Sequence, residues 1–210
     1  MSIVKPARLY PGDHVGIIAP ASRFKKRGFL RGIDKLRYLG FEPVYSSKIF
    51  SYSKKRPQRY QEKAKELIQM INDPTIGAIF CAEGGYGSIA LIAHLEKVDL
   101  SAHPKIIVGF SDITILLLYF HMRYGWMTFH GPTIASELYK GMPPQTEESF
   151  FQVLTQGRKL GDLAKSDLEI IKTGEAKGRL IGGNLTRMIS TLGTPFEINT
   201  HNRVLFIEEI

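Results

Sequence analysis

The sequence is poor in cysteine and in long apolar runs. Its 210 residues contain one cysteine, Cys81, which cannot form an intramolecular disulfide. The longest unbroken apolar run, Ile115 to Phe120, is far shorter than the ~20 residues that span a bilayer. The N-terminus has no apolar segment of the kind that precedes a signal-peptide cleavage site. We therefore expect a cytoplasmic protein with no membrane partner.

The overall composition is typical of a globular protein. Apolar residues make up 43% of the chain, charged residues 23% and aromatic residues 10%. This balance supports a sizeable hydrophobic core and excludes disordered, collagenous and repeat proteins.

Positive charge is concentrated in the first third of the chain. Residues 1–65 contain 16 Lys and Arg against 4 Asp and Glu, whereas residues 66–210 contain 12 against 16, and the total is +8. Clustered cations can bind nucleic acid or another anionic polymer. They can equally form the solvated face of surface helices. We favour the second interpretation and expect no nucleic-acid partner, because no aromatic residues are interleaved for stacking on bases.

Apolar runs alternate with segments of helical periodicity over the first 135 residues. Such alternation is typical of β-α-β units. The expected strands are His14–Ala19, Phe41–Tyr45, Ile76–Ala82, Lys105–Phe110 and Met127–Phe129, and the expected helices are Phe29–Leu39, Gln58–Ile71 and Ile113–Tyr124. Because the strands are almost continuously apolar, we predict an α/β fold with an open parallel sheet and helices on both faces.

The remaining residues differ in character. Residues 136–166 are polar and irregular and are predicted to be a linker, with a short helix at Glu147–Leu154. Residues 167–210 are predicted to begin a second, smaller, strand-rich domain. Its expected strands are Leu168–Ile171, Gly174–Ile181 and Val204–Ile207, with one helix at Leu185–Leu192. Since the sequence stops just after the last of these strands, we expect this domain to be truncated.

Two segments follow the carboxyl ends of apolar strands, where open α/β sheets bind ligands. The first, Glu83 to Ser88, is glycine-rich and enters a helix, so its N–H groups could stabilise an anion or an oxyanion. It matches neither dinucleotide-binding nor phosphate-loop spacing, and it could also be only a tight turn.

The second segment, Gly109 to Asp112, brings a serine to a strand-to-helix turn. This is the location of the nucleophile elbow of serine hydrolases, although Ile113 replaces the last glycine of that motif. The alternative is that Ser111 or Asp112 caps the following helix.

Seven blocks in order resemble the LD-carboxypeptidase family of serine peptidases, which includes microcin C immunity peptidases. The blocks are residues 9–22 (LYPGDHVGIIAPAS), 71–88 (INDPTIGAIFCAEGGYGS), 107–114 (IVGFSDIT), 129–133 (FHGPT), 182–186 (GGNLT), 192–195 (LGTP) and 204–210 (VLFIEEI). The resemblance implies a cytoplasmic hydrolase that releases D-alanine from murein tetrapeptides during cell-wall recycling. It implies no metal and no cofactor, a small peptide as partner and, by analogy, a homodimer.

The resemblance also implies a Ser-Glu-His triad. Ser111 matches the nucleophile, and Glu208 matches the acid, with Glu209 as the adjacent alternative. The oxyanion donors would be the N–H of Asp112 and an N–H of Gly84 or Gly85.

Three features depart from the family pattern. The family histidine lies well beyond Glu208, so we expect this 210-residue chain to lack its base and to be almost inactive. His130 is the candidate replacement, although it could be only a structural histidine. The family's two usual arginines are replaced by Glu83 and Ala90. The alternatives are a microcin-type hydrolase of peptidyl adducts and a non-catalytic, peptide-binding relative.

Overall fold

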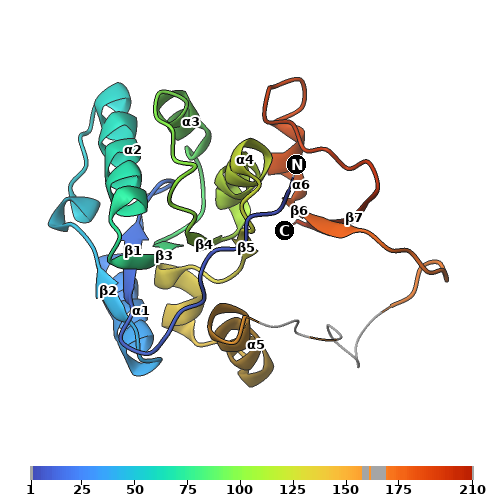
Figure 1. The fold of residues 1–210 in the computed structure, drawn as a ribbon. Coiled ribbons are helices and arrows are strands. Elements are labelled where there is room, and N and C mark those ends of the chain that lie inside the picture. Colours follow the sequence, from blue (N-terminus) through green and yellow to red (C-terminus); the bar gives the residue numbers. More distant parts are fainter. Residues whose placement is uncertain (1, 158–160, 162–168, 210) are drawn as a thin grey trace.

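The computed structural model of the chain describes residues 2–157, 161 and 169–209 and contains a five-stranded parallel sheet (Figure 1). The strand order is β2-β1-β3-β4-β5, and every neighbouring pair is parallel. The strands are β1 (His14–Ile18), β2 (Glu42–Val44), β3 (Ile76–Cys81), β4 (Ile106–Gly109) and β5 (Phe129–His130). The predicted α/β fold is confirmed.

Helices cover both faces of this sheet (Figure 1). One face carries α2 (Arg56–Asn72), α3 (Ile89–Leu95) and α4 (Thr114–Tyr124). The other carries α1 (Lys26–Tyr38), the π-helical turn η3 (Ile134–Leu138) and α5 (Pro144–Thr155). Two short 3₁₀ turns, η1 (Ser47–Phe50) and η2 (Ser111–Ile113), complete these layers.

The alternation of side chains along the strands divides the core into two clusters. In β3, Ile79 and Cys81 pack under α2, α3 and α4, whereas Ala78 and Phe80 pack toward α1 and α5. A strand that is apolar on both faces is the expected consequence of helices on both sides of a parallel sheet.

Helix α5 lies within the segment predicted to be a linker. Its residues Phe150 and Leu154 are buried, and the rings of Phe150 and Phe80 lie 5.7 Å apart. The carbonyl of Leu154 also accepts a hydrogen bond of 2.8 Å from Leu9 N–H. Residues 144–155 therefore pack against the sheet as part of the first unit, although the predicted domain boundaries themselves stay a prediction.

The second unit is a parallel pair of strands, β6 (Arg179–Asn184) and β7 (Arg203–Glu208), with the short helix α6 (Leu185–Ile189) between them. The strand expected at Val204–Ile207 is present in β7. The strand expected at Gly174–Ile181 begins only at residue 179 and continues to Asn184.

The predicted strand at Leu168–Ile171 is wrong for residues 169–171, and Leu168 lies outside the described residues. Residues 169–171 pair with no described strand, and an isolated strand is not stable. β6 includes the glycine pair, where β7 lies so close that a Cβ at Gly182 would be 1.8 Å from the Phe206 carbonyl oxygen.

Because α1 packs closely on η3, adding a single methyl group at Gly32 should lower the free energy of unfolding substantially. A Cβ at Gly32 would lie 2.0 Å from the Ile134 carbonyl oxygen, whereas a Cβ at Gly174 would meet nothing within 4 Å. We expect Gly32→Ala to lower the free energy of unfolding by about 2 kcal/mol. Gly174→Ala should change it by less than about 0.5 kcal/mol in the same urea titration. Equal stability of the two variants would contradict this packing.

Candidate active site

Ser111 occupies a strained turn between β4 and α4. Its φ angle is +58°, and it is one of two non-glycine residues with positive φ in the described part of the chain. Left-handed backbone is unfavourable for residues with a Cβ and persists only where the surrounding structure holds it. A serine in this conformation after a buried strand has the backbone geometry of a nucleophile elbow.

The glycine-rich loop lies directly against this serine. A Cβ at Gly84 would be 3.1 Å from Ser111 Cβ and 3.3 Å from Ser111 Oγ. Gly84 is buried and Ser111 is half-buried. The structure therefore brings together the two segments selected from the sequence, and it leaves little room for a larger side chain at residue 84.

Asp112 connects the Ser111 turn to the start of α3. Its Oδ2 accepts a hydrogen bond of 2.9 Å from Ser88 N–H, and its carbonyl oxygen accepts one of 2.6 Å from the Ser88 hydroxyl. Its Oδ1 lies 3.4 Å from Arg187 Nε. Neither Ser111 nor Asp112 makes a side-chain cap on η2 or α4, so the capping alternative is wrong.

The two acidic residues near the end of β7 have different partners. Asn184 Nδ2 lies 3.2 Å from Glu208 Oε2 and 3.2 Å from Glu209 Oε1. Glu209 Oε2 also accepts hydrogen bonds from Thr186 N–H (2.9 Å) and from the Thr186 hydroxyl (2.6 Å). Glu209 is thus held at the start of α6, whereas Glu208 has fewer fixed partners.

The second unit is anchored beside the Ser111 turn. Asn184 N–H donates a 3.1 Å hydrogen bond to the hydroxyl of Thr114, the first residue of α4. A Cβ at Gly183 would lie 2.6 Å from Thr114 Cγ2, so this close approach requires glycine. These contacts bring the carboxylate-bearing strand β7 to the same side of the sheet as Ser111.

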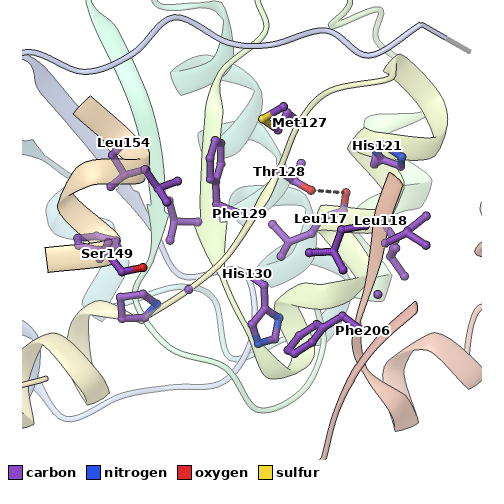
Figure 2. A pocket seen from close by; sticks show the side chains of 18 of the residues that line it. Leu117, Leu118, His121, Met127, Thr128, Phe129, His130, Ser149, Leu154 and Phe206 are labelled. Carbon is purple, nitrogen blue, oxygen red and sulfur yellow. Dashed lines mark hydrogen bonds between the residues drawn. The ribbon is translucent and has the colours of Figure 1, made fainter. Parts of the chain in front are cut away.

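His130, in β5, lies between β4 and β7. Its ring makes an edge contact with Phe206, at 5.1 Å between centroids (Figure 2). It also makes an edge contact with Phe110, at 6.0 Å. Partial burial lowers its pKa, and the negative charge of Glu208 opposes that shift. No hydrogen bond joins His130 to Ser111 in the part of the chain that the structure describes.

A mainly apolar cavity of about 640 Å³ opens beside His130, between β5, α4, α5 and β6 (Figure 2). Its wall includes Leu117, Phe129, Leu154 and Phe206, but not Ser111 or the glycine loop. A second cavity, of about 250 Å³, is lined by Phe110, His130 and Glu137 among others. The candidate site is taken to lie at the strained turn rather than in the larger cavity, because neither Ser111 nor the glycine loop lines that cavity.

Glu83 gives the glycine loop a carboxylate where the resemblance leads one to expect arginine. It is half-buried, and burial raises its pKa, with a further contribution from nearby Glu137. Ala90 lies in α3 and brings no charge. A cation nevertheless contacts the loop, because Arg187 Nη2 donates a 3.2 Å hydrogen bond to Gly85 O.

Lys63 of α2 contacts the loop that follows β1. Its side chain is buried, and its Nζ donates a hydrogen bond to the Ala21 carbonyl. Burial, with a smaller contribution from the charge of Arg59, lowers its pKa to about 8, while Asp112 opposes the shift. The sequence analysis missed Lys63 and Arg187. A helix pattern does not distinguish a buried lysine from a solvated one, and Arg187 comes from a distant element.

The described residues contain no group of three His, Cys, Asp or Glu side chains that could hold a metal ion. No described helix combines the length and apolar character needed to cross a membrane.

Two family profiles match the chain. Residues 15–131 match the LD-carboxypeptidase N-terminal domain, and residues 177–210 match the LD-carboxypeptidase C-terminal domain.

Individual relatives agree with these matches. A protein named probable murein peptide carboxypeptidase, from Bacillus subtilis, is 35% identical over 98% of this chain and 65% of its own length. The microcin C7 self-immunity protein MccF of Escherichia coli is 30% identical over 97% of this chain and 68% of its own length. A solved structure of MccF in complex with glutamyl sulfamoyl guanosine covers 97% of this chain and 70% of that chain, with a TM-score of 0.79 and 27% identity. The chain thus spans about two thirds of the length of these relatives.

The buried lysine predicts a specific dependence of stability on pH. Since the pKa of Lys63 is lowered to about 8, the unfolded chain binds more protons than the folded one above that pH. Stability therefore rises with pH, by about 2 kcal/mol between pH 8 and pH 10 relative to Lys63→Met. Urea titrations of both proteins at each pH measure the difference. Lys65→Met, at an exposed site on the same helix, should follow the unsubstituted protein. A constant difference between the unsubstituted protein and Lys63→Met would contradict the assignment.

Proposed function

This chain belongs to the LD-carboxypeptidase family, and from that premise we propose that it acts as a serine carboxypeptidase on murein peptides. The bond cleaved joins an L-configured centre to a terminal D-amino acid, D-alanine in a tetrapeptide. The observation that carries the proposal is the left-handed backbone of Ser111, at the end of a buried strand and against Gly84.

In this reaction Ser111 Oγ attacks the carbonyl carbon of the scissile amide while a base removes the hydroxyl proton. The negative charge that develops on the carbonyl oxygen accepts hydrogen bonds from the N–H of Asp112 and from the glycine loop. Collapse of the intermediate expels the D-alanine amine, which takes the proton from the base. Water then hydrolyses the acyl-serine by the same steps in reverse order.

Glu208 is the acid that orients the base. Glu209 is engaged by the backbone and hydroxyl of Thr186, and this supports Glu208 as the residue available for an imidazole. A carboxylate in this role fixes the tautomer of the histidine and stabilises the imidazolium without itself becoming protonated.

The base is the histidine that the resemblance implies beyond Glu208. His130 is the alternative within the described residues. Its ring interacts electrostatically with Glu208 and contacts Phe110, the neighbour of Ser111. Burial lowers its pKa and so favours the neutral imidazole that a base requires. Activity of the 210-residue chain by itself would favour His130.

A second candidate function is hydrolysis of an aminoacyl or peptidyl nucleotide adduct. It is favoured by the likeness to MccF, whose solved structure contains glutamyl sulfamoyl guanosine. The same nucleophile would serve both reactions, and the two differ in the acyl group transferred to it and in the leaving group. Comparing turnover of a murein tetrapeptide with turnover of a glutamyl nucleotide adduct distinguishes them.

Replacement of the nucleophile gives the most direct prediction. In the gene product that carries this chain, we expect Ser111→Ala to lower D-alanine release from a murein tetrapeptide by at least about a thousandfold. Binding of the tetrapeptide should stay within about threefold, since the hydroxyl contributes mainly in the transition state. Ser101→Ala, at an exposed loop position, is the matched control and should keep full turnover. Full activity of the Ser111→Ala protein would exclude serine catalysis.

Replacing Glu208 and replacing Glu209 by alanine should have different effects on activity and stability. We expect the loss of kcat in Glu208→Ala to be about ten to a hundred times smaller than the loss in Ser111→Ala. The reason is that the acid orients the base but takes no proton. Glu209→Ala should instead lower the melting temperature while leaving kcat within about threefold, since its hydrogen bonds cap α6. D-alanine release and thermal unfolding of both variants check these outcomes. A larger loss of kcat in Glu209→Ala would reverse the assignment.

A further inference from the structure

The peptide between Gly85 and Tyr86 is held at both of its polar atoms. Arg187 Nη2 donates a 3.2 Å hydrogen bond to Gly85 O. On the other side, Tyr86 N–H donates a 3.0 Å hydrogen bond to Ser22 Oγ. A peptide plane fixed at its carbonyl and at its N–H cannot rotate without breaking a contact, so the glycine loop has a defined orientation beside Ser111.

The preceding peptide is oriented by the same serine. Ser22 N–H donates a 3.1 Å hydrogen bond to Gly84 O. In a trans peptide the carbonyl and N–H point to opposite sides, so Gly85 N–H points away from Ser22. Gly84 N–H is engaged by Glu83 Oε1 at 3.3 Å. Gly85 N–H and Asp112 N–H, by contrast, have no hydrogen-bond partner among the residues that the structure describes.

This arrangement depends on close contact between the loop and Ser22. Gly85 has a φ of +105°, and a Cβ there would lie 2.3 Å from Ser22 Oγ. Only glycine permits both the backbone conformation and the short approach of the serine. Ser22 belongs to the segment after β1, so it brings a third strand end to the site.

Arg187 reaches the loop from α6 in the second unit. Its guanidinium lies 4.6 Å from the centroid of the Tyr86 ring, and its Nε lies 3.4 Å from Asp112 Oδ1. The Arg187 side chain is 18% exposed and that of Asp112 is 1% exposed. One planar cation therefore joins the glycine loop to the residue after the nucleophile.

We propose that Ser22 and Arg187 are positioning residues, which hold Gly85 N–H beside Asp112 N–H as the second donor to the oxyanion. The inference rests on the proposed function, because it takes Ser111 as the nucleophile. It selects Gly85 rather than Gly84, and it makes the oxyanion site depend on contact between the first unit and α6. Neither side chain touches the reacting atoms, so both act through the backbone of the loop.

A ligand that becomes tetrahedral on Ser111 distinguishes a role in positioning the oxyanion donors from a general role in stabilising the fold. The probe is a murein tripeptide whose terminal carboxyl group is replaced by boronic acid, and the reference is the corresponding tripeptide amide. Ser111 Oγ donates an electron pair to boron and a B–O bond forms. The hydroxyl proton passes to the base of the proposed mechanism, and the adduct is a tetrahedral anion. This anion needs the oxyanion donors, whereas the trigonal amide needs them far less.

We expect Ser22→Ala and Arg187→Met to weaken binding of the boronic acid by about tenfold or more, and binding of the amide by less than about twofold. Arg187→Lys keeps a cation beside Asp112 and should recover part of the loss. Arg123→Met is the matched control, because Arg123 forms an exposed ion pair with Glu96 at 3.8 Å, and it should change neither affinity. Ser22→Ala alters no charge, so it carries the test if Arg187→Met does not fold.

The outcomes distinguish this inference from the proposed function. A preference of the unsubstituted protein for the boronic acid that survives undiminished in Ser22→Ala and Arg187→Met overturns the positioning role alone. Equal weakening of both ligands in these variants also overturns it, because it indicates a merely structural effect. Absence of any such preference in the unsubstituted protein overturns the serine nucleophile and the positioning role together.

Discussion

The buried carboxylate of Asp112 is the interaction on which the geometry of the site depends. It binds Ser88 at the start of α3 and faces the guanidinium of Arg187 from α6. Nearly complete burial makes the pair costly to break, since a lone charge would be left without solvent. Three segments that are distant in sequence are thereby fixed around the strained backbone of Ser111, and this explains how the turn retains an unfavourable conformation.

The layers of the fold could be predicted because strand and helix patterns are local. A strand buried on both faces, such as Ile76–Cys81, is apolar throughout, and the amphipathic helices between strands require a parallel sheet. The second unit was harder to predict. The expected strand ends at Ile181, but β6 continues through Gly182 and Gly183, where the Phe206 backbone lies too close for a side chain at residue 182. Such a contact depends on a strand that follows about twenty residues later.

In the candidate site, too, some residues could be selected from the local sequence pattern, whereas others depend on contacts with distant segments. Ser111 and the glycine loop could be selected because each follows an apolar strand, and parallel strands end at one edge of the sheet. Ser22, Lys63 and Arg187 were not selected, since their importance lies in contacts made to the backbone of other segments. A serine or an arginine in a sequence has no pattern that reveals a partner on another element. The proposed oxyanion site is therefore a tertiary property, assembled from segments that follow β1, β3 and β4 and from α6.

The central claim is that Ser111 is an activated nucleophile. Treatment of the gene product with a fluorophosphonate, followed by proteolysis and mass spectrometry of the peptides, measures this directly. Such a reagent phosphonylates a serine hydroxyl only where a base and oxyanion donors activate it. We expect one phosphonyl group, on the peptide that contains Ser111, and no label in the Ser111→Ala protein. Labelling of another residue, or labelling that persists in that variant, would exclude Ser111 as the activated nucleophile.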